Sequence, residues 1–144
     1  MCGIAGILRV DGAPAGADLL GAMTSAIAHR GPDGDGFFCD GSVGLGHRRL
    51  AIIDLDDRAL QPMASADGRL RIVFNGEIYN FRALRAELEG QGARFVTNSD
   101  TEVLLHLYAR DGASMVDRLR GMYAFALWLV SALDLPLTLP KGAL

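Results

Sequence analysis

The amino-terminal run from Cys2 to Val10 constrains the fold of this chain more than any other stretch. Its aliphatic residues stand among small ones, a pattern typical of a short buried strand: Ile4, Ala5, Ile7, Leu8 and Val10. The glycines between them let other backbone approach closely. Most chain termini fray, but a terminus on an internal strand is held in place. The sequence therefore predicts that the first residues lie inside a sheet.

Cys2 directly follows Met1, and this position gives its thiol an unusual neighbour. Once Met1 is removed, the thiol and a free α-amine share one carbon. The reference pKa is about 7.7 to 8.0 for the amine and about 8.5 for the thiol, so a neutral amine can accept the thiol proton near physiological pH. A nucleophile activated in this way is a candidate for covalent catalysis. The alternative is an ordinary cysteine near a start codon.

The length and charge of the chain exclude several classes of protein. Its 144 residues fit one domain with a single core. Half of these residues are hydrophobic, which argues against disorder. The net charge of −3, without a basic block, makes nucleic acid an unexpected partner. We also expect no membrane partner and a cytoplasmic location, because the start does not resemble a signal peptide and the apolar run 122–133 is too short to span a bilayer.

The two cysteines do not indicate a disulfide or a metal site. Nothing else points to an oxidising compartment, and a nucleophilic Cys2 must stay reduced. Cys39 is expected to be a half-buried small residue. No metal site is expected, since a zinc site would lack a close-spaced ligand pair among the five candidates: Cys2, Cys39, His29, His47 and His106.

Helical and strand-like patterns alternate along the rest of the chain. The expected helices are one capped by Asp18, one capped by Asn80, one that begins with the capping box Ser99–Glu102, and a short one at 115–120. The expected strands are two or three short ones between Phe37 and Ile53, one at 70–74 and a buried one at 122–128. The glycines and proline of 29–36 predict a loop. This order indicates an α+β domain of layered sheets covered by helices.

Three places along the chain carry candidate site residues, each with a structural alternative. Arg49, at the start of a strand-like run, can hold a carboxylate or can be a solvated strand end. Asn75 and Gly76 can form a hairpin turn, or can donate their amide and backbone N–H groups to a developing oxyanion. Asp100 suits the first turn of a helix and can also bind an ammonium group.

Six motifs in fixed order resemble a known family. They are Met1 to Gly6, His29 to Gly34, Gly46 to Asp54, Phe74 to Asn80, Ser99 to Glu102, and Gly121 to Ala126. Together they resemble the glutaminase domain of class II glutamine amidotransferases, most of all the amino-terminal domain of glutamine-hydrolysing asparagine synthetases. The resemblance covers residues 1–128. It implies the four-layer αββα sandwich of amino-terminal-nucleophile hydrolases, here without its last strands.

The resemblance also implies a role for each candidate residue. Cys2 is similar to the nucleophile that attacks the carboxamide of L-glutamine, with its own amine as base. Asn75 and Gly76 resemble the oxyanion hole. Arg49 looks like the residue that binds the α-carboxylate, and Asp100 with Glu77 like the residues that hold the α-ammonium. The main chain at Ile52 resembles the segment that lines the substrate.

The resemblance stops after Trp128, where the strands and motifs that follow in the family are absent. The sequence therefore predicts an incomplete domain at 1–128 and a divergent apolar tail at 129–144, as in a truncated or frame-shifted copy. No cofactor is expected in this chain, because ATP and magnesium would belong to the missing synthetase domain, which could be a separate partner. The alternative function is an inactive remnant or interaction module. The oligomeric state is left open.

Overall fold

The computed structural model describes residues 2–51 and 57–130. The strands are β1 (Gly3–Leu8), β2 (Gly34–Asp40), β3 (Val43–Arg49), β4 (Met63–Ala64), β5 (Leu70–Ile78) and β6 (Gly121–Leu129). The helices are α1 (Ala17–Ala26), α2 (Phe81–Gly90) and α3 (Asp100–Asp111), with 3₁₀ turns η1 (Ala28–Arg30), η2 (Asp57–Ala59) and η3 (Gly112–Arg118).

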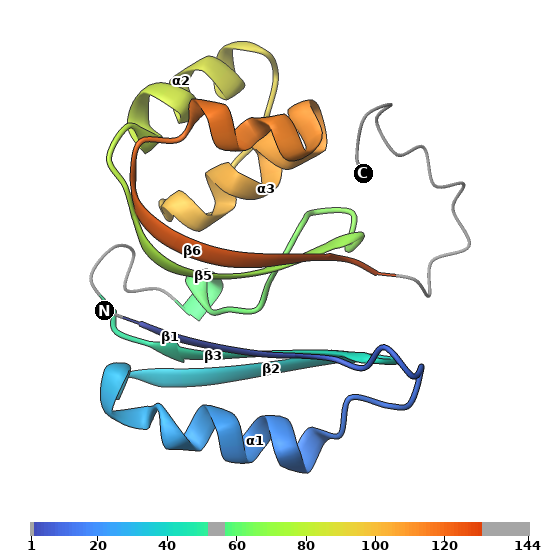
Figure 1. Ribbon diagram of the computed structural model, residues 1–144. Helices are drawn as coiled ribbons and strands as arrows, with labels where there is room; N and C mark the ends of the chain where they lie inside the picture. Colours follow the sequence, from blue (N-terminus) through green and yellow to red (C-terminus); the bar gives the residue numbers. More distant parts are fainter. Residues whose placement is uncertain (1, 52–56, 131–144) are drawn as a thin grey trace.

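These strands form two antiparallel sheets of three strands each. The order is β1-β3-β2 in the first sheet and β4-β5-β6 in the second. Figure 1 shows the sheets face to face, with α1 on the outer side of the first and α2, α3 and η3 on the outer side of the second. The predicted α+β fold with four αββα layers is confirmed.

Glycines and larger residues alternate along β3, so one face of the strand packs against α1 and the other against the second sheet. A side chain at Gly44 or Gly46 would press on Leu20 and on Ala15 or Thr24, so glycine lets α1 lie close to the strand. The alternate residues Val43 and Leu45 point the other way and pack with Val73 of β5. His47 and Arg49 continue this inward face.

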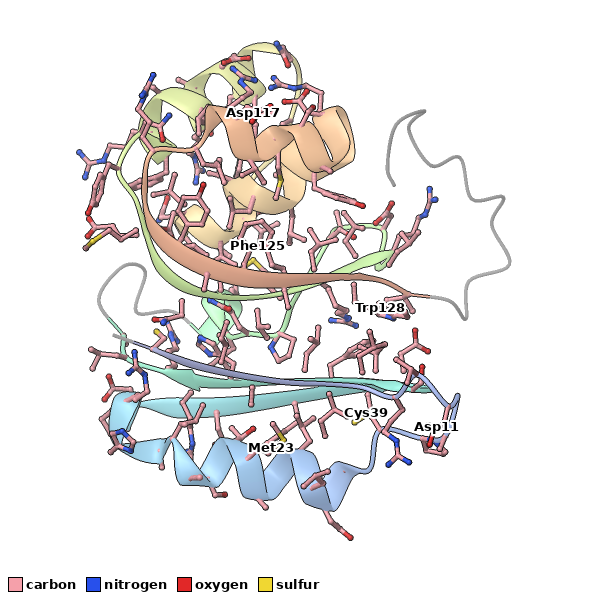
Figure 2. All side chains as sticks on the ribbon, viewed as in Figure 1. Asp11, Met23, Cys39, Asp117, Phe125 and Trp128 are labelled. Atoms are coloured by element: carbon pink, nitrogen blue, oxygen red, sulfur yellow. The ribbon has the colours of Figure 1, made fainter. Side chains whose placement is uncertain are left out.

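The layer between the sheets is apolar toward one end. Val43, Leu45 and Val73 are buried there with Ile4, Phe38 and Trp128 packed around them. Trp128 Nε1 donates a 2.7 Å hydrogen bond to Asp40 Oδ2, which joins β6 to β2 across the layer. Figure 2 shows Trp128 at the end of the sandwich opposite to the amino terminus marked in Figure 1.

The larger core lies between the second sheet and its helices. Leu70, Ile72, Phe74 and Ile78 of β5 point into it, together with leucines of α2 and α3. Because side chains alternate along a strand, Val73, Asn75 and Glu77 face the first sheet instead. The second sheet therefore holds Asn75 against the inter-sheet layer. No helix in the described part of the chain has the length and apolarity needed to cross a membrane.

Two segments differ from the predicted strands. The expected loop at 29–36 is wrong in its last residues, because β2 already begins at Gly34. Glycine is required at position 36 by close packing and not by a turn, since a Cβ at this position would overlap the carbonyl oxygen of Gln61. Arg49 ends β3 instead of starting a strand. The ladder to β1 stops at the Gly3–Arg48 pair, where β1 itself begins.

The hairpin alternative at Asn75 and Gly76 is also wrong. Both residues lie within β5 and face Ala124 and Tyr123 of β6, so the strand continues through them. The partner strand arrives after two helices rather than through a tight turn. The Asn-Gly pattern concerns two neighbouring residues, whereas the conformation is decided by pairing with β6, which lies far along the chain.

Three smaller expectations about single residues need correction. Asp18 does not cap α1, whose N-cap is Gly16; the carboxylate lies in the first turn. Asn80 is the N-cap position of α2, but its side chain binds Arg118 O and Arg120 N instead of the helix. Cys39 is exposed rather than half-buried, because it lies on the edge strand β2.

Candidate active site

The predicted site residues meet in a cavity of about 190 Å³ at the polar end of the inter-sheet layer. Six of the seven line it: Cys2, Arg49, Asn75, Gly76, Glu77 and Asp100. The seventh, Ile52, lies outside the described residues. The six come from the amino end of β1, the end of β3, the second half of β5 and the start of α3.

The Cys2 thiol lies against the backbone just after β3. Leu50 N–H donates to Cys2 Sγ over 3.3 Å, and the thiol lies 3.6 Å from the Leu50 carbonyl, to which it can donate. Arg30 Nε donates a 3.1 Å hydrogen bond to the Cys2 carbonyl. These contacts fix a half-buried thiol in the lining of the cavity. The loop that carries Leu50 is held in turn, because Ala51 N–H donates to Asp33 Oδ2 over 2.9 Å.

Asn75 and Gly76 present an amide and a strand backbone of unusual conformation to the same cavity. Gly76 has φ 148°, which favours glycine, and a Cβ at this position would overlap the Met122 carbonyl oxygen. Asn75 Oδ1 is buried and has no hydrogen-bond partner in the described residues. An unpaired buried amide oxygen in a cavity that also contains a thiol suits a site for a polar ligand.

Opposite charges line the same cavity. Arg49 is only 7% exposed and Asp100 only 4%. Asp100 Oδ2 accepts a 3.2 Å hydrogen bond from Ile78 N–H. Burial raises the pKa of the Asp100 carboxyl, and the nearby Glu77 charge raises it further, against the backbone hydrogen bonds that lower it. One buried cation and a pair of carboxyl groups therefore line the cavity, a combination that suits a ligand with both charges.

Sequence reasoning missed several residues of the lining, among them His47 and Gln61. His47 is 1% exposed, and burial lowers its pKa to about 4, so the ring is neutral at physiological pH. His47 lies two residues before Arg49, so a strand predicted to end at Arg49 would have put both side chains on the same face. Gln61 lies in an irregular segment and gave no signal.

A larger cavity, about 570 Å³, lies between the β4–β5 hairpin and α3. Its lining includes Arg58, Arg71, Glu102 and His106, but none of the six residues above and no thiol. The smaller cavity is therefore the one equipped for nucleophilic chemistry.

The four layers, with a cysteine at the amino end of β1 that faces an inter-sheet cavity, define an amino-terminal-nucleophile amidotransferase fold. A solved structure with this fold is the glutamine phosphoribosylpyrophosphate amidotransferase of Bacillus subtilis, in complex with ADP and GMP. It matches 90% of this chain and 35% of its own, with a TM-score of 0.75 and 25% identity.

The model of the glutamine amidotransferase domain family matches residues 1–137, and the chain belongs to that family. Among its relatives, a glutamine-hydrolysing asparagine synthetase of Bacillus subtilis is 47% identical over 89% of this chain. One from Arabidopsis thaliana is 41% identical over 88%. This chain spans only 21% and 22% of those two proteins. It is thus similar to the glutaminase domain of asparagine synthetases.

Proposed function

We propose that this chain hydrolyses L-glutamine to L-glutamate and ammonia, as the amidotransferase part of an asparagine synthase that uses glutamine. The observation that carries the proposal is the meeting of Cys2, Asn75 and the Arg49–Asp100 pair around one cavity. The family to which the chain belongs supports glutamine as the substrate. The separation of a cation and an acid suits a free α-amino acid, whose carboxylate and ammonium need opposite partners.

The proposed reaction uses groups of this chain and one water molecule. The Cys2 amine, freed by loss of Met1, takes the thiol proton, and the sulfur attacks the carboxamide carbon of glutamine. Asn75 and the Gly76 N–H stabilise the resulting oxyanion. The C–N bond then breaks and ammonia leaves, with the proton that the Cys2 amine took from the thiol. Water hydrolyses the γ-glutamyl thioester to glutamate and restores the thiol.

The test is glutamate release from L-glutamine by the untagged chain, with intact mass confirming loss of Met1. The matched control is a second cysteine: Cys2→Ala should abolish release, whereas Cys39→Ala, at an exposed position, should leave it unchanged. Equal rates for Cys2→Ala and the wild type would refute the proposed nucleophile. No release from a folded chain with a free Cys2 amine would refute the function itself.

This half-reaction is proposed to need no cofactor, because Cys2 supplies both nucleophile and base. Glutamate release should therefore be the same with and without EDTA. ATP and magnesium would be required only by a synthetase domain, in the same or a separate chain, that uses the ammonia. We further propose a cytoplasmic location, which suits a thiol that must stay reduced.

A further inference from the structure

Gln61 is a buried amide that connects two elements of the candidate site. It lies between η2 and β4, is 8% exposed and lines the cavity. Its Oε1 accepts a 2.6 Å hydrogen bond from Phe74 N–H, and its Nε2 donates a 3.2 Å hydrogen bond to Thr101 Oγ1. Both ends of the amide are therefore satisfied inside the protein.

The two partners of Gln61 are sequence neighbours of candidate site residues. Phe74 immediately precedes Asn75 on β5, and Thr101 immediately follows Asp100 at the start of α3. The side chain of Gln61 thus bridges the strand that carries the oxyanion donors and the helix that carries the acidic group.

The bridge takes the place of a missing strand pair. β4 pairs with β5 at Met63–Ile72 and Ala64–Arg71, and the same register would set Gln61 opposite Phe74. β4 begins only at Met63, so the side chain of Gln61, rather than its backbone, satisfies the Phe74 N–H. Unlike a backbone ladder, this contact also reaches the helix behind the sheet.

Gln61 is itself fixed from the first sheet. Gly36 of β2 lies so close that a Cβ there would overlap the Gln61 carbonyl oxygen and touch Pro62. The backbone of the bridging residue therefore packs directly against the sheet that also positions Cys2 and Arg49.

We propose that Gln61 is a positioning residue that sets the distance between the oxyanion donors and Asp100, and so selects substrates with an α-ammonium. This inference rests on the proposed glutamine hydrolysis. A buried amide with two satisfied bonds holds its partners in a narrow range of positions. A displacement of about 1 Å in such a site can cost roughly 10²-fold in rate.

The test compares kcat/KM for L-glutamine and for glutaramate, which is glutamine without its α-amino group. The ratio of the two values does not depend on how much of a variant is folded. The wild type should prefer L-glutamine by roughly 10²-fold or more, because glutaramate leaves Asp100 without a partner. Gln61→Met keeps the length of the side chain but loses both hydrogen bonds, and its preference should fall about tenfold.

Thr101→Val is a second, milder variant, since it breaks only the contact to the helix and leaves Phe74 bound. It should lower the preference while the value for glutaramate stays at the wild-type level. Gln91→Met makes the same chemical change as the first variant at an exposed position on the end of α2, and should change neither value.

The outcomes separate this inference from the function on which it rests. An active wild type with unchanged preference in both Gln61→Met and Thr101→Val would overturn the role of Gln61 and leave the proposed hydrolysis standing. An inactive wild type would overturn both. A fall in preference shared by Gln91→Met would also count against the bridge, because that residue is remote from the cavity.

Discussion

At the scale of single residues, the cavity contains two polar side chains that break the usual rule of satisfied burial. Asn75 Oδ1 and both ring nitrogens of His47 are buried without a well-formed hydrogen bond among the described residues, although the backbone of Phe74 lies near the His47 ring. Most buried polar groups are paired, and an unpaired one costs stability unless a ligand or water satisfies it. Both side chains line the same cavity. The remaining atom of this kind in the described residues, Arg71 Nε, lines the larger cavity instead.

Asn75→Ala should lower the turnover of glutamine by about 10² to 10³ while the protein stays folded, because the proposed oxyanion hole loses one donor. Stability should change little, since Asn75 Oδ1 gives up no hydrogen bond in this structure. Glutamate release and thermal unfolding, measured on the same sample, check both parts. Wild-type turnover in the variant would remove Asn75 from the oxyanion hole.

His47 should make stability depend on pH below neutrality. Its folded pKa of about 4 lies below the ordinary value of about 6.5, so the unfolded chain binds the proton more readily. His47 therefore does not affect stability above about pH 6.5, and it destabilises the fold increasingly as the pH falls toward 4. By pH 4.5 the loss in the free energy of unfolding should reach about 2 to 3 kcal/mol.

Urea unfolding at pH 7 and pH 4.5 measures this loss. His47→Leu should remove that part of the difference between the two pH values, whereas His29→Leu, at an exposed histidine, should not. A wild type and a His47→Leu variant with the same pH dependence would show that the ring already binds a proton in the fold.

Sequence reasoning at this scale found the residues whose chemistry is distinctive by type. A cysteine after the initiator, an arginine before an apolar run and an acid in a helix first turn each carry a recognisable pattern, and all three line the cavity. His47 and Gln61 carry no such pattern. Their importance comes from burial and from partners on distant elements, which the order of residues does not contain.

At the scale of elements, a prediction from sequence was correct where both the residue pattern and the interaction behind it lie within a few residues of each other. Ser99 was expected to cap a helix, and Thr101 N–H does donate to its side chain at the start of α3. The other half of the expected capping box differs. Glu102 turns to Val96 N–H and Thr97 N–H instead of the Ser99 backbone. The incoming segment, rather than the helix end alone, determines where that carboxylate binds.

The hydrogen bond between Trp128 and Asp40 should hold the two sheets together at their apolar end. A double-mutant cycle of Asp40→Ala and Trp128→Phe should give a coupling of about 1.5 kcal/mol in the free energy of unfolding. Circular dichroism is the suitable probe, because Trp128 is the only tryptophan. Additive effects of the two changes would mean that the contact contributes nothing to the joining of β2 and β6.

At the scale of the whole molecule, one inter-sheet layer serves two purposes. Its apolar end, around Val73 and Trp128, joins the sheets, and its polar end forms the cavity. The general αββα architecture followed from the order of strands and helices and from the family resemblance. The division of the layer did not, because it depends on the register of β1 with β3 and on how β5 packs across the layer, rather than on any single element.

L-Glutamine should stabilise the whole domain when it cannot be consumed. Cys2→Ala keeps Arg49, Asn75 and Asp100, so it should bind the substrate and unfold at a higher temperature in its presence. At a concentration of 100 times Kd the gain should be about 2.7 kcal/mol. Glutaramate should give a smaller shift, and a shift of the same size would argue against Asp100 as the ammonium partner.

The pairing of β1 with β3 determines when, during translation, Cys2 becomes fixed in the fold. Cys2 becomes half-buried and fixed against Leu50 only when a strand about forty residues further along has left the ribosome, which takes roughly 2 to 8 s at 5 to 20 residues per second. Until then the first residues have no partner strand and are open to an aminopeptidase. The few seconds before this pairing are therefore the period of translation in which the residue that follows Met1, the proposed nucleophile Cys2, is not yet fixed against Leu50.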